Sequence, residues 1–338
     1  MSHDHTGAAA ASAPNSRLPR LTVGDAAVVL AQYSLPAVQA VRALAGGQAA
    51  KLQTAHGSLL LKRRPAAIAQ RLSRVHAVIH EIAEPLVTTG LVVPAAMRCL
   101  RGETMVVAQG WVYDIAPWSE GERFDGTPHQ AAEAGAALAQ VHQALRTPAV
   151  SAMSGEFTTM THAREPGPLT QPAARSLQRE IALWLDHEQV WAGTSQVLHG
   201  DWHRGNVLFD QAGRVRAALD FELARTGPII AEASSGAVQF ATEIRTGTAE
   251  AWPAETDLSL VGQFVAGYLR SLPSRCFRRK TAVLTESYAK AAPVLMAGAL
   301  LEQAAELESG DGVLTAAVIR KARWILDRHI EISEIFMP

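Results

Sequence analysis

Eight residues near the middle of the chain, 199–206 (HGDWHRGN), concentrate side chains that can do chemistry. Asp201 and Asn206 are five residues apart, and His199 and His203 flank the aspartate. A carboxylate can accept the proton of an attacking hydroxyl group, and an amide oxygen is a hard ligand that suits magnesium. The two histidines and the aspartate also fit a zinc-dependent hydrolase, although no further histidine cluster supplies the remaining ligands that zinc usually takes.

A second acidic group follows nineteen residues after Asp201. Asp220 ends the apolar run AALD, and Phe221 and Glu222 come next. The turn at residues 210–213 would fold this run back beside the loop, so that Asp220 supplies an anionic anchor for a metal ion. Glu222 either contacts a second metal ion or caps a turn. Phosphoryl transfer needs this combination of a carboxylate near the attacking hydroxyl and a metal charge on the phosphates.

Phosphates also need a cation and backbone donors. Lys62 ends the third of three antiparallel strands that short apolar runs and turn signals predict over residues 38–63. Gly46 and Gly47 lie between the first two strands; they either let backbone amides approach the phosphates or simply form a hairpin turn. The sequence contains no GxxxxGK[ST], which excludes a P-loop.

The elements that must position these residues fall into two parts. The first part is predicted to hold the three strands, a long helix and further strands, at 38–63, 66–89, 97–100, 105–109 and 111–118. The second part is predicted to hold helices at 129–145 and 173–191, short strands between 197 and 222, and about four helices from 228 to the end. His142, on the apolar stripe of its helix, is interpreted as a hydrogen-bonded structural residue.

The composition of the chain restricts the classes of partner that it is expected to bind. The chain has 338 residues and a formal net charge of −1, and hydrophobic residues make up 48% of it. This balance suits a globular protein with a sizeable core and argues against nucleic acid as a partner. No apolar run approaches the length of a membrane span. Two cysteines without metal-site spacing, and an Ala- and Ser-rich start without a signal-peptide pattern, predict a cytoplasmic protein with a disordered tail at residues 1–20.

These motifs resemble those of the aminoglycoside phosphotransferase and choline kinase family, a branch of the protein-kinase-like fold that includes homoserine-kinase-like and spore-coat kinase-like members. The resemblance spans roughly residues 28–245 and is most specific at VLHGDWHRGNVLFD followed by AALDFE. Three further segments match: GGQAAKLQTAHGSLLLK (46–62), TGLVVP (89–94) and AGAALAQVHQAL (134–145).

The resemblance implies an α+β, bilobal fold. Its N-lobe, at residues 21–116, would be a small antiparallel β-sheet with one long helix that binds the nucleotide. Its C-lobe, at residues 117–338, would be larger, mainly helical, and would carry the catalytic residues and the acceptor site.

The resemblance also implies a role for the residues of the catalytic loop and the strand after it. Asp201 would be the catalytic base, and Asn206 and Asp220 would bind magnesium. His199 would brace the loop, and His203 would lie near the transferred phosphoryl group.

The nucleotide, ATP or GTP, would be held mainly by the N-lobe. Lys62 would contact its α and β phosphates, and the segment Tyr113–Trp118 would be the hinge that holds the base, with Asp114, Ala116 and Trp118 as its contact residues. A glutamate of the long helix should pair with Lys62; Glu81 is the nearest candidate.

The expected function is therefore that of a small-molecule kinase. The acceptor would be the hydroxyl group of an aminoglycoside, an amino sugar, a hydroxy amino acid or a natural-product intermediate; acidic and basic residues are mixed in the C-terminal region and do not choose among them. The alternative is a non-catalytic, nucleotide-binding member of the same fold. Such a protein would be expected to lose Asp201, Asn206, Asp220 or Lys62, and this chain keeps all four. The oligomeric state stays open.

Overall fold

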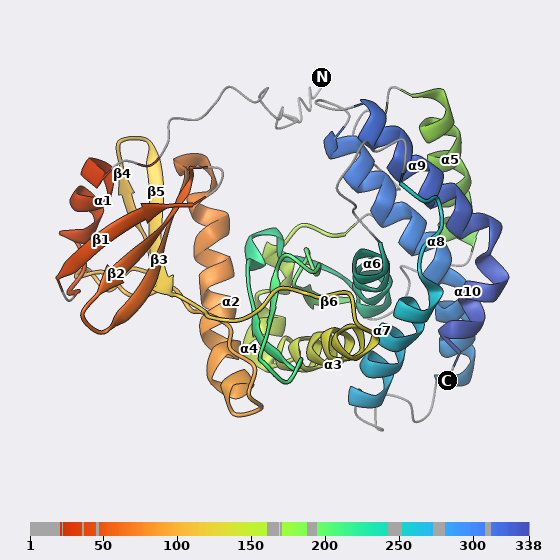
Figure 1. The fold of residues 1–338 in the computed structure, drawn as a ribbon, viewed down its shortest axis with the longest axis horizontal. Helices are drawn as coiled ribbons and strands as arrows, with labels where there is room; N and C mark the ends of the chain where they lie inside the picture. Colours follow the sequence, from red (N-terminus) through yellow and green to blue (C-terminus); the bar gives the residue numbers. More distant parts are fainter. Residues whose placement is uncertain are drawn as a thin grey trace, which may run out of the picture.

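The computed structural model describes residues 21, 23–35, 37–44, 47–160, 169, 171–187, 195–242, 252–272, 281–307 and 312–337. The tail expected at 1–20, Gly46 and Cys276 lie outside these residues. Figure 1 shows a sheet-containing part beside a larger helical part, joined by a single connection after β5. We call these parts the N-lobe and the C-lobe.

The N-lobe is a five-stranded antiparallel sheet in the order β1-β2-β3-β5-β4, with one helix on either side of it (Figure 1). Its elements are α1 (Val23–Leu30), β1 (Val38–Ala43), β2 (Ala49–Thr54), β3 (Gly57–Pro65), a 3-10 turn (Ala66–Ile68), α2 (Ala69–Val87), β4 (Val106–Ala108) and β5 (Trp111–Pro117). The three hairpin-connected strands and the long helix are therefore confirmed.

The two faces of β3 have different environments, because alternate residues of a strand point to opposite sides of the sheet. Leu61 belongs to the small core beneath α1, and Arg63 forms an ion pair with Asp25 of α1 at 3.5 Å. Lys62 and Arg64 consequently face the other side, where they line a cleft between the lobes. The period of the strand thus places both of these cations in the cleft.

The C-lobe contains two small antiparallel β-sheets surrounded by helices. Its elements are α3 (Pro128–Ala144), α4 (Pro148–Ala152), a 3-10 turn (Ser154–Glu156), α5 (Pro172–His187), β6 (Ser195–Leu198), β7 (Val207–Phe209), β8 (Val215–Ala218), a 3-10 turn (Phe221–Leu223), β9 (Arg225–Pro228), α6 (Ile229–Ala241), α7 (Leu258–Ser271), α8 (Thr281–Leu307), α9 (Gly312–Asp327) and α10 (His329–Ile335). Strand β6 pairs with β9, and β7 pairs with β8.

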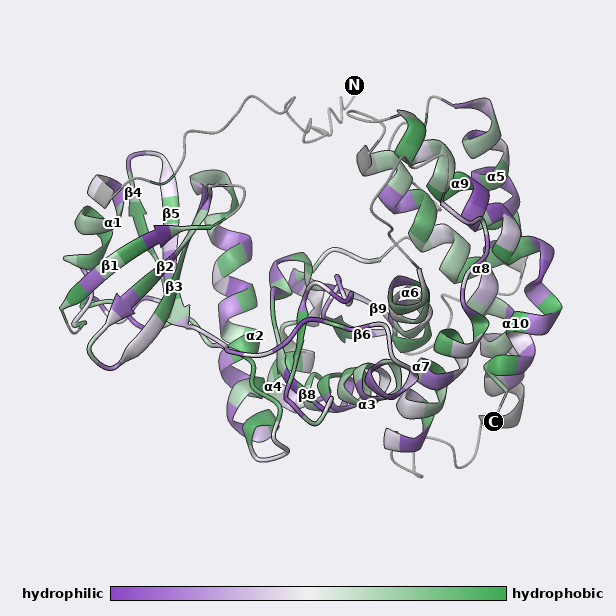
Figure 2. Ribbon diagram, viewed as in Figure 1, coloured by the Kyte–Doolittle hydropathy of each residue, from purple (hydrophilic) through white to green (hydrophobic). Residues whose placement is uncertain are grey.

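Helices α3, α6, α7 and α8 enclose the main hydrophobic core. Helix α6 is central and mainly hydrophobic, whereas α5, at the edge, carries many hydrophilic residues (Figure 2). Helices α3 and α7 approach very closely: a Cβ atom added to Gly135 would lie 1.9 Å from the carbonyl oxygen of Phe264. The burial of apolar side chains in this core is the main source of stability for the C-lobe.

Several predicted elements and one predicted boundary were wrong. Residues 97–100 do not form a strand; the N–H of Met97 donates to the carbonyl of Ile115, and the N–H of Cys99 donates to that of Glu103, which makes a turn. Strand β8 ends at Ala218 and does not continue to residue 222. Helix α1 and strand β9 were not predicted, and the described residues beyond 228 form five helices.

Within the described ranges, no helix is both long and apolar enough to cross a membrane.

Candidate active site

The loop at residues 199–206 joins β6 to β7 and is anchored from below by a buried acid. Glu232 of α6 accepts hydrogen bonds from the backbone N–H groups of His199, at 3.0 Å, and Gly200. Its carboxylate also lies 2.8 Å from Nε2 of His142, whose Nδ1 lies 2.8 Å from the hydroxyl of Tyr268. Burial raises the pKa of Glu232, but the contact with His142 and the loop donors outweigh it, so the pKa lies below its ordinary value.

Sequence reasoning missed Glu232, although its setting contained a signal. Residues 229–241 read IIAEASSGAVQFA, and a lone acid among small and apolar residues in a central helix must have a buried partner. The partner, His142, was interpreted as a structural histidine, and its buried contacts agree with that interpretation.

The carboxylate of Asp201 is held by two neighbouring side chains. Nε2 of His203 lies 3.3 Å from Oδ2 of Asp201, and the side-chain amide of Asn206 donates to the same oxygen at 2.9 Å. The N–H of Gly205 donates to Nδ1 of His203, so the ring proton lies on Nε2, facing the carboxylate. Burial raises the pKa of Asp201, but these contacts outweigh it and keep the pKa below its usual value. Asp201 is therefore an oriented, ionised carboxylate.

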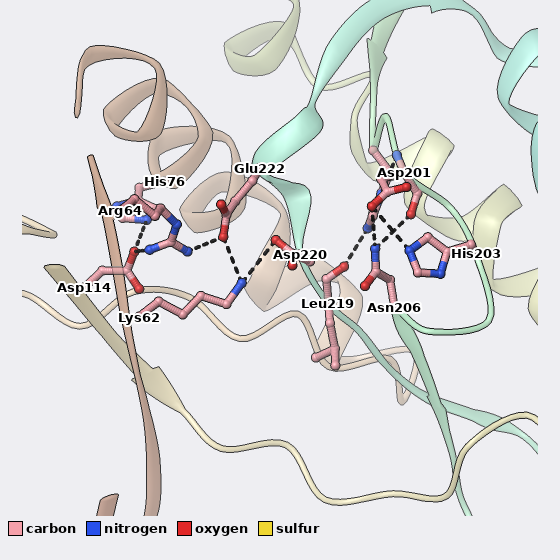
Figure 3. A network of polar contacts seen from close by, with 11 residues as sticks. Lys62, Arg64, His76, Asp114, Asp201, His203, Asn206, Leu219, Asp220 and Glu222 are labelled. Carbon is pink, nitrogen blue, oxygen red and sulfur yellow. Dashed lines mark hydrogen bonds and ion pairs between the residues drawn. The ribbon is translucent and has the colours of Figure 1, made fainter. Parts of the chain in front are cut away.

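The nitrogen and the oxygen of the Asn206 side-chain amide point in different directions. Its Nδ2 donates to the backbone carbonyl of Asp201 at 3.0 Å as well as to the carboxylate, which fixes the plane of the amide. Figure 3 shows the amide oxygen turned away from Asp201. The N–H of Leu219 donates to the backbone carbonyl of Asn206 at 2.8 Å, which brings the residue before Asp220 next to the loop. The amide oxygen is thus a fixed hard donor in the cleft that Asp220 also lines.

His199 braces the loop from within. Its Nε2 donates to the carbonyl of Leu219 at 2.8 Å, and its Nδ1 accepts from the N–H of Asp201 at 3.2 Å. Burial lowers the pKa of the ring, which packs against Phe221 and Trp202. Both ring nitrogens are occupied, so His199 cannot be a metal ligand. Among the described residues, no group of three or more His, Cys, Asp and Glu side chains could hold a metal ion, so the structure offers no support for the zinc-hydrolase alternative.

The turn after β8 brings two acidic side chains, Asp220 and Glu222, into the cleft. Asp220 has a left-handed backbone, with φ +63°, and Phe221 to Leu223 form a single 3-10 turn. Lys62 lies 3.1 Å from Oδ1 of Asp220 and 2.9 Å from Oε1 of Glu222 (Figure 3). Burial raises the pKa of Asp220, with a further rise from Glu222, whereas Arg64 and Lys62 overcome burial and hold the pKa of Glu222 well below its usual value.

Most of the predicted site residues meet in one cleft between the lobes. Its lining includes Lys62, Asp114, Ala116, Trp118, Asn206, Asp220 and Glu222. The lining also includes Arg64, which the sequence analysis did not assign to the site. The guanidinium of Arg64 contacts Asp114 at 2.6 Å and also contacts Glu222.

The prediction that Glu81 pairs with Lys62 was wrong. Glu81 lies on an exposed face of α2, and the residues of this helix that line the cleft are Leu72, Val75, His76 and Ile79. Five residues separate Glu81 from His76, which corresponds to a rotation of about 140° around a helix with 3.6 residues per turn. The acids that meet Lys62 are Asp220 and Glu222, which come from the other lobe.

Two other predicted nucleotide contacts require correction. Asp114 lies inside β5, opposite Lys62 of β3, so it is not a hinge residue; the connection between the lobes begins at Trp118, after β5 ends. Gly47 has φ +71°, and its N–H donates to the carbonyl of Leu44 at 3.1 Å. Its amide is therefore used within a hairpin turn, which agrees with the alternative interpretation of the glycine pair.

A cleft with this composition suits one kind of chemistry. The oriented carboxylate of Asp201 is held by Asn206, which lines the cleft together with Asp220. Lys62 and Arg64 line the cleft from the opposite lobe. Such a site can place a hydroxyl group and a polyphosphate together and stabilise the charge that moves between them. The fold and the site define a kinase-like phosphotransferase.

The comparison with family models agrees. The chain matches the Phosphotransferase enzyme family (APH) over residues 39–278, which is more than half of its length, and it belongs to this family. The predicted family, the protein-kinase-like fold and the phosphotransferase class of enzyme are confirmed.

Solved structures with the same fold cover nearly the whole chain. The microcompartment-associated aminopropanol kinase has a TM-score of 0.68 at 14% identity and covers 93% of this chain and 99% of its own. An aminoglycoside phosphotransferase from Alicyclobacillus acidocaldarius has a TM-score of 0.64 at 16% identity and covers 94% and 98%. Amicoumacin kinase, in complex with AMP-PNP, Ca²⁺ and Ami, has a TM-score of 0.63 at 15% identity and covers 90% and 92%.

A curated sequence relative matches only a short segment. The uncharacterized protein YcbJ of Bacillus subtilis is 43% identical over 42 residues, which are 12% of this chain and 14% of that protein.

Proposed function

We propose that this enzyme transfers the γ-phosphoryl group of ATP, or of GTP, to a hydroxyl group of a small molecule, with Asp201 as the general base. The observation that carries the proposal is the double restraint on Asp201 by His203 and Asn206. This restraint keeps the carboxylate ionised and oriented, as proton abstraction from an attacking hydroxyl requires. The N-lobe, 21–116, would hold the nucleotide, and the C-lobe, 117–338, would provide the base and the acceptor site.

Magnesium is the proposed cofactor, because the donors present are those that it prefers. Asn206 offers an amide oxygen held in place by the contacts of its Nδ2, and Asp220 offers a carboxylate that projects into the cleft. When bound, the ion would neutralise phosphate charge. The third oxygen donor considered from the sequence, Glu222, is already held by two cations.

The nucleotide is proposed to lie against the cleft-facing side of the sheet. Lys62 would contact the α and β phosphates, and Ala116 and Trp118, at the end of β5 and the start of the connection between the lobes, would border the base. Trp118 is fixed from the outside by Lys51, whose Nζ lies 4.3 Å from the ring centre and 3.1 Å from Glu120. An ordered aromatic surface at this edge suits a planar base.

The acceptor is proposed to be a small hydroxylated compound: an aminoglycoside, an amino sugar, a hydroxy amino acid or a natural-product intermediate. The named relatives of this fold act on different compounds, among them aminopropanol and aminoglycosides. Fold alone does not determine the acceptor, so the proposal stops at this class.

The test is the release of ADP from Mg·ATP in a coupled assay over a panel of aminoglycosides, amino sugars, choline and hydroxy amino acids. Asp201→Asn should lower kcat by about 10²- to 10⁴-fold, because the base is lost while the shape is kept. Its affinity for AMP-PNP should stay unchanged. A matched control is Asp210→Asn, which removes a carboxylate from the turn after β7, where it pairs with Arg214.

Two results would contradict the proposal. One is an Asp201→Asn variant that keeps full turnover with an acceptor that stimulates the wild type. The other is a wild-type protein whose melting temperature does not respond to Mg·ATP, Mg·GTP or AMP-PNP.

A further inference from the structure

The anionic partner of Lys62 comes from the opposite lobe. On α2, the cleft is lined by three apolar residues and His76, and none of these positions carries a carboxylate. Lys62 instead contacts Glu222 at 2.9 Å and Asp220 at 3.1 Å, both in the turn after β8. The position of Lys62 is therefore set by a C-lobe turn. That turn must itself be held in place.

Arg64 holds the turn after β8 in place. Its Nη1 donates to Oδ2 of Asp114 at 2.6 Å, and its Nη2 donates to Oε1 of Glu222. The Arg64 and Asp114 side chains are only 10% and 6% exposed. Asp114 is supported in turn by His76, whose Nε2 lies 3.5 Å from the same Oδ2 and whose Nδ1 contacts Thr104. We call Asp114, Arg64 and Glu222 the Arg64 clamp (Figure 3).

We propose that the Arg64 clamp takes the place of a helix glutamate. Arg64, held by Asp114, is a positioning residue that fixes Glu222 against Lys62, so that Lys62 is aimed at the nucleotide phosphates. The metal ion is left to Asn206 and Asp220. This inference rests on the proposed function, because it assigns tasks within the same phosphoryl-transfer site.

Two features support the assignment of Glu222 to the two cations and of Asp220 to the metal ion. Oε1 of Glu222 receives both Lys62 and Arg64, and moving Glu222 onto a metal ion would leave the buried Arg64 with half of its partners, which is costly. Asp220, by contrast, is 38% exposed. The planar fork of arginine also matters, because its Nη1 and Nη2 each donate to a carboxylate from a different lobe.

The test separates nucleotide positioning from metal binding. Arg64→Met keeps the apolar stem and removes the fork. It should raise KM for ATP about tenfold or more, and it should weaken binding of ADP without magnesium, measured by calorimetry, by a similar factor. Asp114→Asn should change both quantities in the same direction by a smaller factor. It should add nothing in the Arg64→Met background, because the two residues act as one unit.

Glu222→Gln is the decisive variant for the metal. It should raise KM for ATP while the free magnesium concentration for half-maximal activity stays at the wild-type value; Asp220→Asn should raise that concentration at least about tenfold. The control Arg42→Met removes an exposed positive charge from β1 of the same sheet and should change none of these quantities.

Three outcomes would overturn the inference. Glu222→Gln could shift the magnesium requirement as much as Asp220→Asn, which would make Glu222 a metal ligand. Arg64→Met could lower the melting temperature and leave both KM and ADP binding unchanged, which would make Arg64 a folding residue only. The double variant Arg64→Met/Asp114→Asn, which leaves neither buried charge unpaired, could bind ADP as the wild type does. Failure of the proposed function would appear separately, as an Asp201→Asn variant that keeps its turnover.

Discussion

His142 of α3 and Glu232 of α6 lie 2.8 Å apart in the core of the C-lobe, next to the loop at residues 199–206. The two side chains are 2% and 1% exposed. Through Glu232 this pair holds the backbone at the start of the loop, and through His142 it reaches the hydroxyl of Tyr268 on α7. Three helices and the loop therefore share one polar centre, and the stability of the lobe depends on the charge of one carboxylate.

That charge makes stability depend on pH. The pKa of Glu232 is lowered from 4.5 in the folded protein, so its contribution is fully present above about pH 4.5 and is lost as the pH falls towards the folded value. Urea unfolding between pH 3.5 and 7 should show stability falling with acid in the wild type. Glu232→Gln should lose about 3–5 kcal/mol at pH 7 and show a weaker decline on the acid side.

The matched control is Glu180→Gln, since Glu180 makes an exposed ion pair with Arg323 at 2.9 Å. Such pairs contribute little, and this variant should stay within about 0.5 kcal/mol of the wild type. If Glu232→Gln and Glu180→Gln have the same stability at pH 7, the assigned role of Glu232 is wrong.

Gly200 cannot be replaced without moving the turn that carries the acids. Its φ is +88°, and a Cβ atom would lie 1.8 Å from the carbonyl oxygen of Leu223. Gly200→Ala should therefore destabilise the protein by more than about 2 kcal/mol and lower kcat as well, measured by urea unfolding and by ADP release. Gly155→Ala, where nothing lies within 4 Å of the added atom, is the control. Equal stability of the two variants would show that the loop and the turn are not in close contact.

His203 should act on turnover and not on nucleotide binding. It orients Asp201 through its Nε2, so His203→Ala should lower kcat by about 10- to 100-fold and leave KM for ATP unchanged. His129→Ala, which removes an exposed ring that contacts the carbonyl of Ala212, should leave both constants at wild-type values. A rise in KM for ATP with unchanged kcat in His203→Ala would instead place this histidine at the nucleotide.

Glu81 and Lys62 should behave as unrelated residues. Lys62→Met should raise KM for ATP at least about tenfold, because a phosphate contact and the partner of two carboxylates are lost. Glu81→Gln changes an exposed side chain and should leave KM, kcat and stability at wild-type values. A coupling energy between the two substitutions in a double-mutant cycle would restore the pairing that the structure excludes.

The difference between Glu81 and Glu222 shows what could be predicted from sequence. The loop at 199–206 is local: its spacing sets which side chains meet, and Asn206 indeed reaches Asp201 five residues away. The partner of a strand lysine is decided by how two lobes pack. Glu222 is 160 residues from Lys62, and no periodic pattern links them.

Arg64 and Glu232 were missed for the same reason. Their partners lie 158 and 90 residues away, so neither the run KRR at residues 62–64 nor the helix at 229–241 shows which residue each of them meets. By contrast, the three hairpin-connected strands of the N-lobe, the long helix and the hairpin turn at 210–213 follow from period and turn chemistry, and they were predicted correctly. The strand proposed at 97–100 failed because a short apolar run can also close a turn.

The contacts of Lys62 and Arg64 with Glu222 join a strand of one lobe to a turn of the other. A rotation that widens the cleft has to separate both cations from the acid at the same moment. The work of opening is therefore electrostatic and decreases as ionic strength rises, because partly exposed charges are screened by salt. In this enzyme one carboxylate shared by two cations therefore links the two lobes.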